Sequence, residues 1–172
     1  MKNGTILLWD KRKTNKGFKL LISKAIVAVT NMPITHSGVW LQGHLYEQDK
    51  KSLFKQGLMV STNANADVYM EPVEPLSDNQ ARLMVGYIEK TYGGRGYNTL
   101  KLLFMALLAP FKEYFRKVRW MPFDKPWFGE VCSVMPDEAY RYIGIDLFPE
   151  EFEGYTAPGD YLECLKLKKV KS

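Results

Sequence analysis

A cysteine stands just ahead of a predicted helix in "GEVCSVMPDEAYRYIGIDLFPEEF" (129–152). Proline is tolerated only in the first turn of a helix, so Pro136 places the helix start close to Cys132, and Gly144 supplies the C-terminal stop. A thiol at a helix N-terminus is favoured as the thiolate by the helix dipole and by N–H groups, which can also hold an oxyanion. A single cysteine is equally typical of a buried core. This segment alone therefore leaves catalysis and simple packing both open.

A catalytic thiol needs a base, and the chain contains two histidines, His36 and His44. The dipeptide Gln42-Gly43 separates two β-prone runs, "ITHSGVWL" (34–41) and "HLYEQD" (44–49), and so predicts a two-residue hairpin turn between them. The two histidines then belong to neighbouring strands of one hairpin.

Pairing within this hairpin distinguishes the two histidines. A two-residue turn places Gly38 opposite Glu47, and side chains alternate between the two faces of a strand. His36 and Glu47 are then diagonal neighbours on one face, whereas His44 points to the other face. Gly38 leaves space for the carboxylate to reach the imidazole, and Asp49 is the alternative orienting residue if the strand continues that far. The prediction depends on the turn length, because a slip of one residue reverses the faces.

The composition predicts a single soluble domain of the α+β class. The chain has 172 residues, of which 46% are hydrophobic and 25% are charged, which suits one globular core. Strands dominate the first half and helices follow, as in α+β proteins. The predicted elements are a strand over 4–10, a helix over 19–31, strands over 34–41, 44–49, 57–63 and 67–73, helices over 76–94 and 97–120, and a last strand within 158–170.

Charge and short motifs limit the possible partners. The net charge is +5, with basic clusters at 11–19, 112–119 and 166–172, which suits solvated loops or an anionic cell-wall polymer or membrane surface. No nucleic-acid motif is present, so we expect no nucleic-acid partner. We also expect neither metal nor other cofactor, because metal-ligand spacings such as C-x-x-C are missing. The longest apolar run, 102–111, is too short for a membrane span, and the first residues do not resemble a signal peptide, which predicts a cytoplasmic protein.

Several segments resemble a known superfamily. "CSVMPDEAYRYIGIDLFP" (132–149) resembles the nucleophile segment of the NlpC-type, papain-like cysteine peptidases, and "THSGVWLQGHLYE" (35–47) resembles their His strand with the following strand. The histidine precedes the cysteine here, as it does in the circularly permuted YiiX-like branch and the lecithin:retinol acyltransferase-like enzymes. "NGTILLWD" (3–10), "YGGRGYNTLKLLF" (92–104) and "APGDYL" (157–162) are similar to further segments of that branch.

The resemblance implies a single permuted papain-like domain over 1–172, in which an antiparallel sheet packs against helices. It also implies an inserted helical, aromatic segment near 100–128. The implied site residues are Cys132 as nucleophile, His36 as base, Glu47 as the orienting residue, and Tyr97 and Ser133 at the substrate and oxyanion side.

The implied activity is that of a thiol hydrolase that cleaves an amide bond in a peptide, with cell-wall peptides as the leading substrate. One alternative is an ester or thioester hydrolase or acyltransferase at a membrane surface, which the apolar run at 100–111 beside a basic cluster would suit. Another is a binding module without chemistry. Val134 favours that alternative, because it stands where an acidic residue usually follows Cys-Ser in the branch. A second departure is Thr5, which stands where the opening strand usually has Asp.

Overall fold

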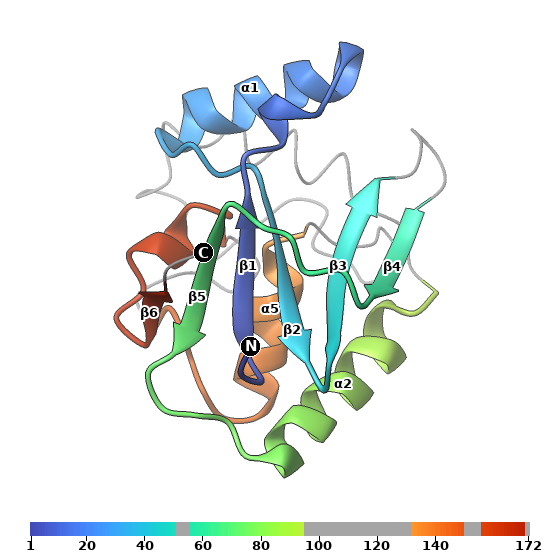
Figure 1. Cartoon of the computed structure of the whole chain (residues 1–172), viewed down its shortest axis with the longest axis vertical. Helices are drawn as coiled ribbons and strands as arrows, with labels where there is room; N and C mark the ends of the chain where they lie inside the picture. Colours follow the sequence, from blue (N-terminus) through green and yellow to red (C-terminus); the bar gives the residue numbers. More distant parts are fainter. Residues whose placement is uncertain (51–55, 95–131, 150–155, 171–172) are drawn as a thin grey trace, which may run out of the picture.

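One antiparallel sheet organises the chain. The computed structural model describes residues 1–50, 56–94, 132–149 and 156–170, and six strands within these ranges form the sheet in the order β4-β3-β2-β1-β5-β6 (Figure 1). The strands are β1 Thr5–Trp9, β2 His36–Leu41, β3 His44–Lys50, β4 Gln56–Ser61, β5 Val68–Pro72 and β6 Leu167–Val170. The predicted α+β class is therefore confirmed.

The described helices are arranged around this sheet. They are α1 Gly17–Thr30, α2 Asp78–Tyr92 and α5 Val134–Tyr142, together with the short 3-10 helices η1 Lys11–Lys13 and η4 Asp160–Leu162. Helices α2 and α5 contact each other and β2, and Figure 1 shows α5 behind the central strands with α1 beyond the end of the sheet. Among the described helices, none has the length and apolar character needed to cross a membrane.

The main core lies between the sheet and helices α2 and α5. Apolar side chains alternate along the strands, so one face of β1, β2 and β5 joins the apolar stripes of the two helices. The fully or almost fully buried members from these elements are Ile6, Leu8, Val39, Leu41, Met70, Ala81, Met84, Ile88, Tyr92, Met135, Ala139 and Tyr140. This packing fixes α5 against β2, the strand that begins at His36.

The β2–β3 hairpin has the predicted two-residue turn. Gln42 and Gly43 both adopt positive φ angles, 50° and 81°, as a tight turn with the right-handed twist of the strands requires. Leu41 pairs with His44 and Gly38 with Glu47. The predicted register, and with it the assignment of residues to faces, is confirmed.

Helix α5 begins at Val134, two residues after Cys132, with Ser133 as its N-cap. Pro136 is the third helical residue and so lies in the first turn, where a missing N–H is harmless. Gly144 ends the segment with a φ of +84°. The predicted helix start close to Cys132 is correct, and the cysteine itself lies just outside the helix.

Of two further predicted helices, one is present in the structure and the other lies outside the described residues. The helix predicted over 76–94 is α2, which begins with a capping box: Ser77 Oγ accepts from the Gln80 N–H and the Gln80 side chain accepts from the Ser77 N–H. The helix predicted over 97–120 and the insert near 100–128 lie outside the described residues.

The backbone at Gly4 makes a close contact that a side chain would disrupt. The φ of Gly4 is +85°, and a Cβ there would lie 2.3 Å from the Tyr140 hydroxyl and 2.6 Å from Leu76 Cδ1. Tyr140 is buried in the core, and its hydroxyl donates to the Gly4 carbonyl at 2.5 Å. The ring therefore has little freedom to move away.

We predict that Gly4→Ala lowers the free energy of unfolding by roughly 2–4 kcal/mol, because backbone strain and overpacking act together. Gly43→Ala is the matched control, since its φ is +81° but a Cβ there has nothing within 4 Å. That variant should lose only about 1 kcal/mol. Urea unfolding measures both values, and equal losses would contradict the close packing of Tyr140 on Gly4.

Candidate active site

Three elements bring the predicted thiol, imidazole and carboxylate together. His36 opens β2, Glu47 lies in β3, and Cys132 immediately precedes the start of α5. His36 Nε2 donates to Glu47 Oε2 at 2.8 Å, so the predicted diagonal neighbours are in direct contact. The other ring nitrogen, Nδ1, remains to face the thiol.

The glycine opposite Glu47 makes this contact possible. A Cβ at Gly38 would lie 3.1 Å from Glu47 Cβ and 2.9 Å from the Tyr46 carbonyl oxygen, both closer than ordinary packing. Without that atom, the Glu47 side chain can lean along the sheet toward His36. The predicted role of Gly38 in making room for the carboxylate agrees with this geometry.

His36 also interacts with the thiol. Burial opposes charge on the imidazole, but the negative charge of Cys132, a side-chain hydrogen bond with Cys132 and the hydrogen bond with Glu47 outweigh it and raise the pKa of His36 to about 9. The imidazole is therefore protonated at neutral pH. The same attraction favours the thiolate form of Cys132, since the interaction stabilises both charges of the pair.

The site is enclosed. The exposed fractions of Cys132, His36 and Glu47 are 2%, 5% and 9%, and the Trp9 ring lies 5.4 Å from the His36 ring, centroid to centroid. Lys11 Nζ lies over the Trp9 ring, 5.2 Å from its centroid. Exclusion of water strengthens the attraction within a charged pair but also opposes the charge on the imidazole. The interactions with Cys132 and Glu47 are therefore what keep His36 protonated.

Hydrogen bonds with segments that are distant in the sequence hold the start of α5 in place. Ser37 Oγ donates to the Cys132 carbonyl at 3.3 Å. The Ser133 hydroxyl donates to the Thr156 carbonyl, and the Tyr161 hydroxyl donates to the Ser133 carbonyl. The Ser133 side chain, predicted at the substrate side, is thus turned toward the backbone, where it holds the helix start.

A buried carboxyl extends this network. Thr156 Oγ1 donates to Asp137 Oδ2 at 2.8 Å, and an Arg141 guanidinium nitrogen lies 3.5 Å from the same oxygen. Asp137 is almost fully buried, and burial raises its pKa to about 6. Sequence reasoning missed this network, because its partners are far apart in the chain and follow no strand register.

The remaining candidate residues are placed as follows. His44 is exposed, with Nδ1 3.0 Å from the Gln42 carbonyl in the hairpin turn, and the register places it on the strand face opposite to His36, as predicted. Neither cysteine forms a disulfide; the Cys164 thiol donates to a backbone carbonyl, and burial raises its pKa. Tyr97 and the side chain of Asp49 lie outside the described residues.

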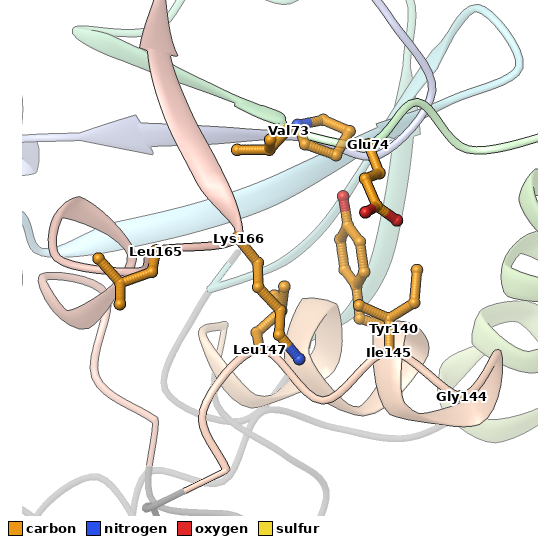
Figure 2. Close-up of a pocket in the computed structure, with 9 residues that line it drawn as sticks. Val73, Glu74, Tyr140, Gly144, Ile145, Leu147, Leu165 and Lys166 are labelled. Atoms are coloured by element: carbon orange, nitrogen blue, oxygen red, sulfur yellow. The ribbon is translucent and has the colours of Figure 1, made fainter.

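A cavity lies at the opposite end of α5 from Cys132 (Figure 2). Tyr140, Gly144 and Ile145 line it from the helix end, and Glu74 and Lys166 line it from the segments beside β5 and β6. Cys132, His36 and Glu47, the three residues of the candidate triad, do not line this cavity. It is therefore separate from the candidate active site.

Functional inference for this chain rests on the geometry of the site. A scan against protein-family models finds no match, and neither does a search of curated proteins. The arrangement itself offers a thiol, a base in contact with it, and a carboxylate that orients the base, which are the parts of an activated nucleophile.

We predict that the His36 imidazole titrates with a midpoint near pH 9, so that the ring keeps its proton below that pH and loses it above. Cys132→Ala should lower the midpoint strongly, because burial would then be opposed only by Glu47. Glu47→Gln should lower it less. Proton–carbon NMR of the imidazole measures all three values, with Cys164→Ala as the unchanged control. A wild-type midpoint that Cys132→Ala does not move would contradict the ion pair.

Proposed function

We propose that this protein is a cysteine hydrolase that cleaves an amide bond of a peptide through an acyl-enzyme. One observation carries the proposal: His36 is hydrogen-bonded to Glu47 on one side and to Cys132 on the other. One ring nitrogen meets a carboxylate that orients the ring, and the other meets a thiol with which it can exchange a proton. Contact with both, in an enclosed site, is what a base serving a thiol nucleophile requires.

We further propose that the fold belongs to the permuted papain-like group. The antiparallel sheet, the hairpin carrying His36 and Glu47, and the later helix preceded by Cys132 support this assignment. The resemblance of 132–149 and 35–47 to the NlpC-type peptidases supports it independently. The order of histidine before cysteine agrees with the permuted, YiiX-like branch.

In the first half-reaction the Cys132 thiolate attacks the substrate carbonyl carbon. The electron pair of the C=O bond moves to oxygen, and the backbone N–H of Cys132, near the helix N-terminus, donates to this oxyanion. The resemblance adds Tyr97 as a second donor. The intermediate then collapses, the C–N bond breaks, and the leaving amine takes the proton of the His36 imidazolium.

In the second half-reaction water hydrolyses the thioester. His36, now neutral, accepts a proton from the water as its oxygen attacks the acyl carbon. Collapse of this intermediate breaks the C–S bond, releases a carboxylic acid and restores the imidazolium–thiolate pair. Glu47 holds the ring in one orientation throughout both steps.

The substrate class follows from the resemblance and the charge. The NlpC-type resemblance favours a peptide amide, and a net charge of +5 suits an anionic cell-wall peptide. A lipid ester or thioester is the competing substrate class, and it forms a separate arm of the test.

Intact mass spectrometry after incubation with peptides, muropeptides and acyl thioesters tests the proposal. Wild type and the matched Cys164→Ala variant should both acquire an acyl adduct from a peptide-type substrate, and Cys132→Ala should not. Hydrolysis by Cys132→Ala should fall by roughly 1,000-fold or more.

An adduct that persists in Cys132→Ala would contradict the proposal. The lack of any adduct or turnover with all three substrate classes would also contradict it, and is the result expected of a binding module. An adduct from acyl thioesters alone would show that the substrate is an ester or thioester and not a peptide amide.

A further inference from the structure

Gln48 is the most anomalous polar residue of the described segments. Its side chain is completely buried, at 0% exposure, and neither Nε2 nor Oε1 has a hydrogen-bond partner within the part of the chain that the structure describes. Buried polar groups in proteins are generally paired, because an unpaired amide loses its bonds to water without replacement. An unpartnered amide in a core is therefore a candidate for binding an external group.

Gln48 lies across the hairpin from Ser37, whose hydroxyl is bonded to the segment that carries the candidate nucleophile. The β2–β3 ladder ends at the Gly38–Glu47 pair, and the next residues outward are Ser37 on β2 and Gln48 on β3. Alternation places these two side chains on the same face, opposite to Glu47. The Ser37 hydroxyl donates to the Cys132 carbonyl at 3.3 Å. The Gln48 amide is thus directed to the face on which the start of α5 is anchored.

The chemistry of the amide indicates what it could bind. A glutamine side chain offers two N–H donors and a carbonyl acceptor, which is the complement of a peptide group with its C=O and N–H. An ester or thioester presents only the carbonyl. A bound ester or thioester would leave Gln48 Oε1 without a hydrogen-bond donor, and Oε1 also lacks one in this structure.

We propose that Gln48 is a specificity-determining residue that hydrogen-bonds a peptide group of the substrate beside Cys132, and so selects amides over esters. The inference rests on the proposed function, since it requires an acyl group to be bound at Cys132. Nε2 donates to the substrate carbonyl and Oε1 accepts from the substrate N–H. A site built to pair both groups rejects an analogue that lacks one of them, because a buried acceptor is left unpaired.

The burial of Gln48 matches that of the triad. Cys132 is 2% exposed and His36 is 5% exposed, so the nucleophile and the amide are enclosed to a similar degree. A glutamine serving only to fill the core would be replaced without loss by methionine, which has a similar shape and no unpaired polar atoms. This difference separates the two roles experimentally.

Two alkylating probes of nearly identical shape test the proposal, N-methyl iodoacetamide and methyl iodoacetate. Each reacts by the same step, in which the Cys132 sulfur bonds to the methylene carbon and iodide leaves with the electron pair of the C–I bond. Only the first probe carries an N–H. The measurement is the ratio of the two rates at Cys132, by peptide mass mapping, divided by the ratio for N-acetylcysteine.

In wild type this normalised ratio should be roughly five-fold or more in favour of the amide. Gln48→Met should lower the normalised ratio to about one. The same substitution should raise Tm by about 2–6 °C, because it removes unpaired polar atoms from the core. An exposed amide on α2 is the control: Asn79→Met should leave the ratio unchanged. Gln48→Leu provides a second apolar variant if the methionine variant does not fold.

A normalised ratio of one in wild type would overturn the assignment, and so would an unchanged ratio in a folded Gln48 variant. Both results leave the proposed hydrolase intact if Cys132 still reacts faster than Cys164. Equal reaction of the two cysteines with both probes would instead overturn the hydrolase proposal together with this one.

Discussion

The candidate site depends on one hydrogen bond, from the His36 imidazole to the Glu47 carboxylate at 2.8 Å. The two residues lie on adjacent strands, and they meet only because a two-residue turn at Gln42-Gly43 sets the register. One residue more or fewer in that turn would send the carboxylate to the other face of the sheet. Gly38 completes the arrangement, since a side chain there would crowd Glu47. The geometry of the candidate site thus depends on a turn that contributes none of its three side chains.

The thiol reaches this pair through a different part of the fold. Helix α5 packs on the core formed by α2 and the sheet, and its first residues are held by Ser37 from β2 and by Thr156 and Tyr161 from the C-terminal segment. Cys132 precedes the helix N-cap, so the helix dipole acts on it from just outside the first turn. Contact with the protonated His36 is therefore the stronger influence on the thiol.

Strand register and helix signals made much of this site predictable from sequence. Gln42-Gly43 fixed the hairpin and hence the side-by-side placement of His36 and Glu47, and Pro136 fixed the start of α5. The hydrogen bonds to α5 from the C-terminal segment were not predictable, because no local pattern brings residues so far apart together. Gln48 also escaped prediction, since register gives the face of a side chain but not whether its amide finds a partner.

The most direct measurement is the rate of alkylation of Cys132 relative to Cys164 by iodoacetamide at neutral pH, in wild type and in His36→Ala. Both thiols are buried, so burial alone would make them similarly slow. An imidazolium–thiolate pair predicts that Cys132 reacts roughly ten-fold faster or more in wild type, and that this advantage disappears in His36→Ala. Equal rates in wild type, or an advantage that survives the loss of His36, would contradict the account.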